Sequence, residues 1–302
     1  MAQVGTFVEK DFKELAGIPD NIHIRLPISD EEVLGFVPAG EVAVRSSAFF
    51  TGGLRLPFTN WVASFFEAVQ IAPAQLALNG YRTLNGIQRL SELSGIPIEL
   101  KDVFGVYSLS FERRSSYLKT LRAFCRLVIG LPDTNKERNL GIVIASGEWA
   151  CPGHQIPGPA TNAPTMPDLG APNVEALLAL WKWWGPGPTP DPASRTAPML
   201  LGYPMGSVTK GNPAPEIPKE PEEEFLKVVR ARSAARLGKK AVRSKRRASD
   251  PVVETTKRAR GTDTSVTEED ANVGSGEGVF AASQGDTTED ASAPGDVCVY
   301  VF

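Results

Sequence analysis

Cys151 and His154 are separated by two residues in Cys-Pro-Gly-His, the gap found in one half of many zinc sites. A tetrahedral structural site needs four ligands, and no second Cys or His pair follows along the sequence. The chain has only two histidines, His23 and His154, so histidine-based catalysis has few candidates. We predict no metal site and no bound cofactor.

The acidic residues do not indicate a catalytic site either. Two-metal nuclease or transposase chemistry needs carboxylates that converge from strand ends, whereas Asp102 and Asp133 stand in turn-like sequences without a third acid in a suitable position. The P-loop, Gly-x-Ser-x-Gly and His-Glu-x-x-His motifs are absent, as is the Asp-Thr/Ser-Gly of aspartic proteases. We predict no catalytic residues and a protein that is not an enzyme.

The strongest chemical signal is a basic segment over residues 225–260, which has 13 Lys or Arg against two acids. Lys257-Arg258-Ala259-Arg260 has the form of a nuclear import core. Upstream cations that belong to the same segment are Lys239, Lys240, Arg243, Lys245, Arg246 and Arg247. We expect an import receptor as partner and nuclear localisation, together with contact to the phosphates of DNA or RNA without sequence preference. An inert solubilising tail is the alternative.

Few aromatic residues interrupt this basic segment, which argues against base stacking there. Ser249 follows Arg246-Arg247-Ala248 and resembles the target of a basophilic kinase, where phosphate would lower the local positive charge. Charge runs of this density are typically disordered, so a flexible segment is expected.

The net charge of −3 results from basic and acidic residues that lie in separate parts of the chain. Residues 261–302 contain nine acids and no Lys or Arg, which predicts an acidic disordered tail. No apolar run is long enough to cross a bilayer, and no membrane partner is expected. Cys125, Cys151 and Cys298 are too few and too far apart for a disulfide framework, which fits a soluble protein in a reducing compartment.

Proline marks the expected domain boundary, because 16 of the 25 prolines lie between residues 150 and 224. We predict a globular domain over 1–150 and a Pro/Gly-rich linker over 151–224. Within the linker, Val174, Leu177, Leu178, Trp181 and Trp184 follow helical spacing after Asn173, which predicts an amphipathic helix over 173–184. This helix either packs back on the domain or serves as a groove-binding peptide for another protein.

Two helices are predicted between Gly52 and Gly95. The first starts after Pro57, with Thr59 or Asn60 as N-cap, and ends before Pro73. Its apolar positions are Trp61, Val62, Phe65, Phe66 and Val69. The second is capped by Asn79, presents Tyr81, Leu84, Ile87 and Leu90, and ends at Gly95.

Period-two patterns predict strands at 103–111, 121–129 and 140–145, with polar connectors at 112–117 and 132–138. The proline-punctuated entry before them offers one short strand at Val42–Val44. The fold class is therefore α+β, a helical N-terminal half followed by a small antiparallel sheet, with a long disordered C-terminal region.

Three sequence blocks, "FFTGGLRLPF" (49–58), "IAPAQL" (71–76) and "NGYR" (79–82), together with "IVIASGEW" (142–149), resemble the plant gypsy-type transposon domain. The resemblance covers residues 18–150 and rests mainly on turn and packing residues. It implies a gag-like structural protein derived from a retrotransposon, with no catalytic residues to carry over. Arg55, within the first block, is expected to make a structural hydrogen bond to a nearby carbonyl.

Two hypotheses follow. The first is a non-enzymatic, gag-like protein that self-associates or binds other proteins through its globular domain. The second is a nuclear, nucleic-acid-associated protein that acts through its basic tail.

Overall fold

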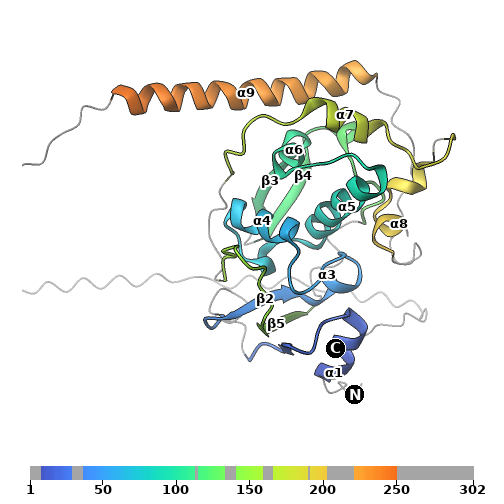
Figure 1. Ribbon diagram of the computed structural model, residues 1–302, viewed down its shortest axis with the longest axis vertical. Coiled ribbons are helices and arrows are strands. Elements are labelled where there is room, and N and C mark those ends of the chain that lie inside the picture. The colour runs from blue at the N-terminus through green and yellow to red at the C-terminus, as the bar shows by residue number, and fades with distance from the viewer. Residues whose placement is uncertain are drawn as a thin grey trace, which may run out of the picture.

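The computed structural model describes residues 8–28, 37–112, 115–132, 141–158, 166–189, 191–202 and 221–249, with backbone only for 238–249. Their fold is α+β, as predicted, with one three-stranded and one two-stranded sheet, both antiparallel. Figure 1 shows the three-stranded sheet near one end of the molecule, most of the helices above it, and a long helix across the opposite end.

The three-stranded sheet has the order β1-β5-β2, formed by Ile22–Arg25, Ile142–Gly147 and Glu41–Arg45. The strand predicted at Val42–Val44 is present within β2. Helix α1 (Glu9–Ala16) packs on this sheet through buried Phe12, whose ring meets Phe49 of α3 (Ser46–Phe50) edge to face at 5.7 Å.

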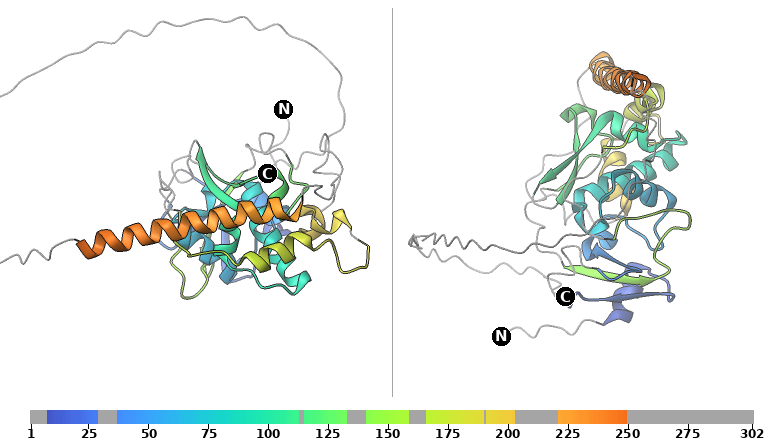
Figure 2. Two further views of the ribbon diagram at one scale, coloured as in Figure 1. Left: turned by 90° about the horizontal axis from the view of Figure 1, so that it is seen from above. Right: turned by 90° about the vertical axis from the view of Figure 1, so that its left-hand side faces the viewer.

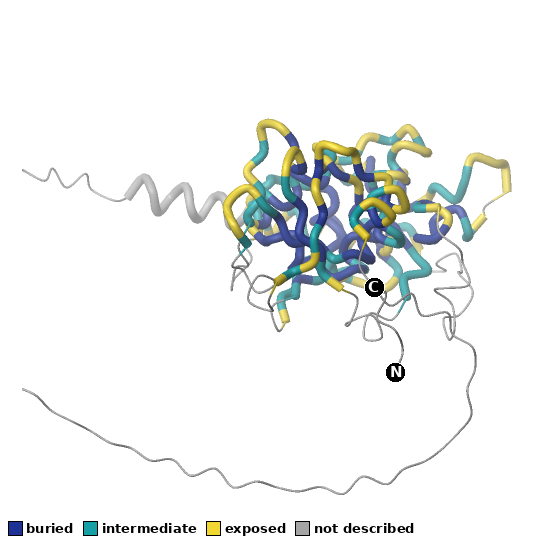
Figure 3. Tube along the Cα trace, turned by 90° about the horizontal axis from the view of Figure 1, so that it is seen from below, coloured by how far each residue is buried: buried dark blue, intermediate teal, exposed yellow. Residues whose placement is uncertain are grey.

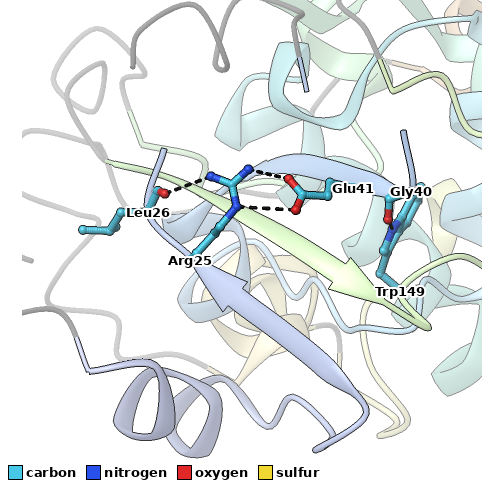
Figure 4. Close-up of polar contacts among 5 residues, drawn as sticks. All are labelled: Arg25, Leu26, Gly40, Glu41 and Trp149. Carbon is cyan, nitrogen blue, oxygen red and sulfur yellow. Dashed lines mark hydrogen bonds and ion pairs between the residues drawn. The ribbon is translucent and has the colours of Figure 1, made fainter. Parts of the chain in front are cut away.

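An ion pair spans the central strand of this sheet. Arg25 on β1 donates to the Glu41 carboxylate on β2, so the two edge strands are tied across β5 (Figure 4). Beyond the end of β5, the Trp149 indole N–H donates to the Gly40 carbonyl at 2.8 Å, in the turn that leads into β2. Both contacts fix β5 between its two neighbours.

The two central helices largely follow the predicted pattern. Helix α4 (Asn60–Val69) starts after Thr59, whose hydroxyl accepts the Val62 N–H at 3.3 Å, and a 3₁₀ helix η1 (Pro73–Gln75) comes after it. Helix α5 (Leu78–Ser94) ends at Gly95, which adopts the left-handed conformation as expected. Its predicted apolar positions Tyr81, Leu84, Ile87 and Leu90 are fully buried.

The predicted N-cap of α5 is wrong. The helix begins one residue before Asn79, with Ala77 at the cap position. The Asn79 side chain instead donates to the Pro132 carbonyl at 2.6 Å and accepts from Arg82 at 3.0 Å. Its polar groups are therefore used in tertiary contacts.

The predicted strand positions are partly wrong. Residues 103–111 divide between helix α6 (Leu100–Val106) and strand β3 (Tyr107–Glu112), and the supposed connector 112–117 contains the start of β4 (Ser115–Thr120). β3 therefore pairs with the residues just beyond it in a tight hairpin. The strand predicted at 140–145 exists as β5, but it belongs to the other sheet.

No strand forms over 121–129, where the 3₁₀ helix η2 (Ala123–Cys125) precedes a segment that bends at Leu127 and Val128. The backbone of this segment is bonded by side chains and, at Ile129, by one isolated parallel bridge to Thr196. The Tyr107 hydroxyl accepts from the Leu127 N–H at 3.0 Å, and Arg195 donates to the Leu127 carbonyl at 2.9 Å. The strand predicted over 121–129 is therefore wrong, because the chain there forms a 3₁₀ helix and bends before the single bridge at Ile129.

Buried residues fill the interior of the described chain (Figure 3), and they continue well beyond residue 150. Helix α7 (Val174–Lys182), capped by the Asn173 side chain as predicted, buries Leu177, Leu180 and Trp181. The 3₁₀ helix η4 (Pro192–Arg195) and helix α8 (Ala197–Leu201) follow it into the same core. The segment predicted as a linker thus supplies part of the core, and the interpretation of α7 as a helix that packs back on the domain is confirmed.

Two hydrophobic clusters meet at α5. The first joins the three-stranded sheet, α1, α3 and α4 to Leu78, Tyr81 and Leu84. The second gathers α6, α7, α8 and the start of α9 (Glu222–Ser249) around Ile87 and Leu90. Helix α5 is therefore the common wall of the two halves of the core.

Candidate nucleic-acid interface

Helix α9 concentrates the positive charge of the chain. Glu222, Glu223 and Glu224 occupy its first turn, where acids interact favourably with the positive end of the helix dipole. No acid follows within the helix, and its cations are Lys227, Arg230, Arg232, Arg236, Lys239, Lys240, Arg243, Lys245, Arg246 and Arg247. The start of the basic segment is a helix packed on the domain, so the expectation of a flexible segment is wrong for residues 225–237.

The first turns of α9, residues 222–229, which we call its root, pack in the second hydrophobic cluster. Phe225 is fully buried and stacks on the Trp181 ring of α7, with centroids 4.8 Å apart, and Val229 is buried one turn later. At the same end, Lys182 of α7 and Glu222 form an ion pair. An aromatic stack in a buried core fixes the direction in which the helix leaves the domain.

Arg236 extends this attachment by two further turns. Its guanidinium donates to the Gly170 carbonyl at 3.3 Å and lies 5.9 Å from the centre of the Phe104 ring of α6. Burial lowers the pKa of Arg236, and the nearby Arg232 lowers it further. Residues 222–236 thus dock on α6 and α7.

The remainder of α9 runs past the folded body (Figure 2). From Arg236 to Ser249 the helix rises about 20 Å at 1.5 Å per residue. Of the predicted site residues, Lys239, Lys240, Arg243, Lys245, Arg246 and Arg247 lie on this helical backbone, as does the phosphorylation candidate Ser249. Lys257, Arg258 and Arg260, and the acidic tail 261–302, lie outside the described residues.

A second basic surface, missed in the sequence, lies on the β3–β4 hairpin. A groove of about 350 Å³ separates β4 from the segment 126–132, and its lining includes Tyr117, Lys119 and Arg126. We call it the hairpin groove. The Lys119 ammonium lies 6.0 Å from the centre of the half-buried Tyr117 ring, and both Lys119 and Arg126 are exposed.

Arg45 of β2 approaches the same face of the hairpin. It donates to the Leu76 carbonyl at 3.2 Å and to the Ser115 hydroxyl at 3.5 Å. Burial lowers the pKa of Arg45, and the neighbouring Tyr81 and Tyr117 offset part of this effect. Arg45, Tyr117 and Arg126 come from three separate elements, so no local sequence pattern could have grouped them.

The far wall of the hairpin groove is held by a buried cation. Arg195 is fully buried, donates to the carbonyls of Leu127 and Trp181 at 2.9 and 2.8 Å, and also donates to the Arg126 carbonyl. Its guanidinium lies 4.1 Å from the centre of the Trp184 ring. Burial lowers the pKa of Arg195 to about 10, so the group is charged at neutral pH.

The residues that carry the transposon-domain resemblance have structural contacts. The buried Tyr81 hydroxyl donates to the Pro73 carbonyl at 2.8 Å, and burial raises its pKa. Arg82 donates to the Thr51 hydroxyl at 2.8 Å, and the Asn85 amide donates to the Gly52 carbonyl at 2.7 Å. The third block and the residues after it therefore tie the first and second blocks together.

Arg55 makes the kind of hydrogen bond expected of it, to the carbonyl of the adjacent Leu54 at 3.2 Å. Its exposed side chain also lines a groove of about 780 Å³ between α5 and α8. Arg89, Leu93 and Met199 line the same groove. This groove has both signs of charge and no concentration of cations.

The candidates for metal and acid–base chemistry are committed to other partners. The Cys151 thiol donates to the Asn60 side chain at 2.9 Å, and the His154 ring N–H donates to Glu67 at 2.8 Å. Asp102 accepts from the backbone N–H groups of Glu99 and Asn173, and burial raises its pKa. Within the described residues, no group of three or more His, Cys, Asp or Glu side chains could hold a metal ion. Asp133 lies outside them.

In the described part of the chain, no helix combines the length and apolar character needed to span a bilayer. Comparisons with family models, curated proteins and solved structures gave no match. The transposon-domain resemblance therefore stays a prediction that rests on the quoted residues.

Proposed function

We propose that this protein is a non-enzymatic, nucleic-acid-associated protein that contacts phosphates through α9. The observation that carries the proposal is the polarised helix: an apolar root packed on Trp181 and a long basic continuation without acids. Beyond its docked turns the helix continues for about 20 Å, and cations spaced along it neutralise several consecutive phosphates of a nucleic acid at once. Phosphate contacts carry no sequence information, so binding is expected to be blind to sequence.

The test is a salt titration of the full chain with labelled duplex DNA. If about six cations contact phosphates, the log–log slope is near −5, and raising salt from about 50 to 200 mM weakens binding on the order of a thousandfold. A triple variant, Lys239→Gln with Lys240→Gln and Arg243→Gln, should weaken binding and make the slope shallower by about 2 to 3.

The matched control removes three exposed cations elsewhere, by Lys10→Gln, Arg55→Gln and Arg89→Gln. Both triple variants change the net charge equally, so a difference between them reports the position of the charges. Equal binding by the two variants, or a strong preference for one sequence at fixed salt, would refute α9 as the interface.

The gag-like, self-associating role implied by the resemblance is the second candidate. It is favoured by the position of the matching residues, since Phe49, Leu54, Leu56 and Pro73 are buried and build a scaffold. Light scattering across a range of protein concentrations tests it: assembly that grows with concentration supports this role, and a constant monomer mass argues against it.

A further inference from the structure

The hairpin groove differs from α9 in carrying an aromatic ring among its cations. Tyr117 lies on β4 between Ser115 and Lys119 in the two-residue register of a strand, so all three side chains share one face of the hairpin. On β3, Ser110 pairs with Tyr117 and Ser108 with Lys119, which gives that face small polar neighbours. Tyr117 is half-buried and lines the groove, so part of its side chain is accessible from the groove.

Cations flank this ring on two sides. Lys119 lies on the same strand, and Arg126 lines the groove opposite. The described residues that line the groove include no Asp or Glu, and Glu112 on the same face of the hairpin stands at its far end, paired with Ser115. The groove thus combines a partly open aromatic ring with local positive charge.

We propose that the hairpin groove binds single-stranded nucleic acid, with a base stacked on Tyr117 and adjacent phosphates at Lys119 and Arg126. This inference rests on the proposed function and adds a second contact with a different preference. Stacking on an aromatic side chain requires an unstacked base, which a single strand offers and an intact duplex does not. In this proposal α9 attracts the phosphates of any nucleic acid, whereas the groove prefers single strands to duplexes.

The rigidity of the groove supports this assignment. Leu127 and Val128 donate their backbone N–H groups to the buried Tyr107 hydroxyl, at 3.0 and 3.4 Å, and Arg195 holds the carbonyls on the same segment. Across from it, β4 is fixed to the core by the Ala77 N–H, which donates to the Ser116 carbonyl at 2.9 Å. These contacts hold the backbone of both walls, from which Tyr117, Lys119 and Arg126 extend.

The test compares two probes, a labelled oligouridylate and a labelled DNA duplex, on the full chain at one salt concentration. Tyr117→Ala should weaken oligouridylate binding by about five- to a hundredfold and leave duplex binding unchanged. Tyr117→Phe keeps the ring and should bind both probes as the unmodified chain does. Lys119→Gln with Arg126→Gln should weaken oligouridylate binding and make its salt slope shallower by about 1.

Melting temperatures of the variants establish that each is folded, and Tyr117→Phe preserves the fold if Tyr117→Ala does not. For an unstable Tyr117→Ala protein, the Lys119 and Arg126 double variant decides the result. The proposed single-strand site is refuted if that variant binds oligouridylate as tightly as the unmodified chain does. It is also refuted if Tyr117→Ala loses the same amount of affinity for both probes. The α9 triple variant separates the two proposals: if it leaves both probes unaffected, the proposed role of α9 fails while a Tyr117 effect still stands.

Discussion

Arg195 occupies a place where most proteins put an apolar residue. It is fully buried, and its guanidinium bonds carbonyls from the 126–128 segment and the end of α7. Loss of these bonds leaves buried acceptors unsatisfied, at a cost of about 1–3 kcal/mol each. We expect Arg195→Met to lower the free energy of unfolding by about 3 kcal/mol or more, measured by urea denaturation.

Arg89→Met on the exposed side of α5 is the control for Arg195→Met and should change stability by no more than about 0.5 kcal/mol. Arg195→Lys keeps the charge but has one nitrogen to serve several carbonyls, so it should also be less stable than the unmodified chain. Full stability of Arg195→Met would mean that the carbonyls find other partners.

The Glu67–His154 contact makes stability depend on pH. The hydrogen bond from His154 lowers the pKa of Glu67 below its ordinary 4.5. A carboxyl whose folded pKa is lowered contributes stability above its unfolded pKa, and this contribution disappears as pH falls through the folded value. Glu67→Gln should therefore be less stable at neutral pH, with the difference vanishing in acid.

Denaturation curves collected at several pH values test the Glu67 prediction. Glu92→Gln, at an exposed i,i+3 pair with Arg89 on α5, is the control. A stability difference between Glu67→Gln and the unmodified chain that persists well below pH 4.5 would contradict the assignment.

At the scale of elements, α9 is a long helix that depends on a short root. Phe225→Ala removes the ring that stacks on Trp181 and should release the first turns of α9 from α7. Because trypsin cuts after Lys and Arg in accessible backbone, cleavage at Lys227 and Arg230 should become faster than in the unmodified chain. Mass spectrometry of the fragments reports the sites.

Leu237→Ala on the same helix is the control for Phe225→Ala, since Leu237 is 55% exposed. Its digestion should match that of the unmodified chain. Equal protection of the root in Phe225→Ala would show that Val229 and Arg236 hold α9 without the aromatic stack.

Helices were more predictable from the sequence than strand pairing. α4, α5 and α7 carry their apolar spacing within the element, so their positions and most of their buried faces were accessible, although α7 ends at Lys182 and the predicted Trp184 lies beyond it. The partner of a strand lies elsewhere in the chain, and β5 was assigned to the wrong sheet for that reason. The segment 121–129 was misread because Tyr107 and Arg195, both outside it, bond its backbone.

The two candidate interfaces also differ in how far the sequence could predict them. The basic run of α9 is contiguous and was visible in the sequence, although its helical state was not predicted. The hairpin groove combines side chains from β4 and the 126–132 segment, with Arg45 of β2 beside them, so it emerges only from tertiary structure.

At the scale of the whole molecule, the charges of the chain are separated along its length. The nine acids of 261–302 attract the same cations as nucleic acid does. A chain ending at Arg260 should therefore bind duplex DNA more tightly than the full chain, and the gain should shrink as salt rises. Anisotropy titrations at low and high salt measure both effects, and weaker binding by the shortened chain would contradict competition by the tail.

Nuclear import is the second prediction at this scale. Replacing Lys257, Arg258 and Arg260 together with Lys245, Arg246 and Arg247 by alanine should leave a fluorescently tagged chain in the cytoplasm, because import receptors read closely spaced cations. Replacement of Lys10, Arg55 and Arg89 serves as the control and should leave nuclear accumulation intact. Nuclear accumulation of the six-residue variant would remove these clusters as the signal.

The order β1-β5-β2 also constrains when the molecule can fold. Its two edge strands are complete at Arg45, whereas the strand that must enter between them begins at Ile142. At the usual pace of the ribosome, the intervening residues take about 5–20 s to synthesise. Throughout that interval β1 and β2 lack their shared partner and expose unpaired backbone, a state prone to aggregation. The sheet at the beginning of the chain is therefore a late event in biosynthesis, and the helical core between its strands has the opportunity to form first.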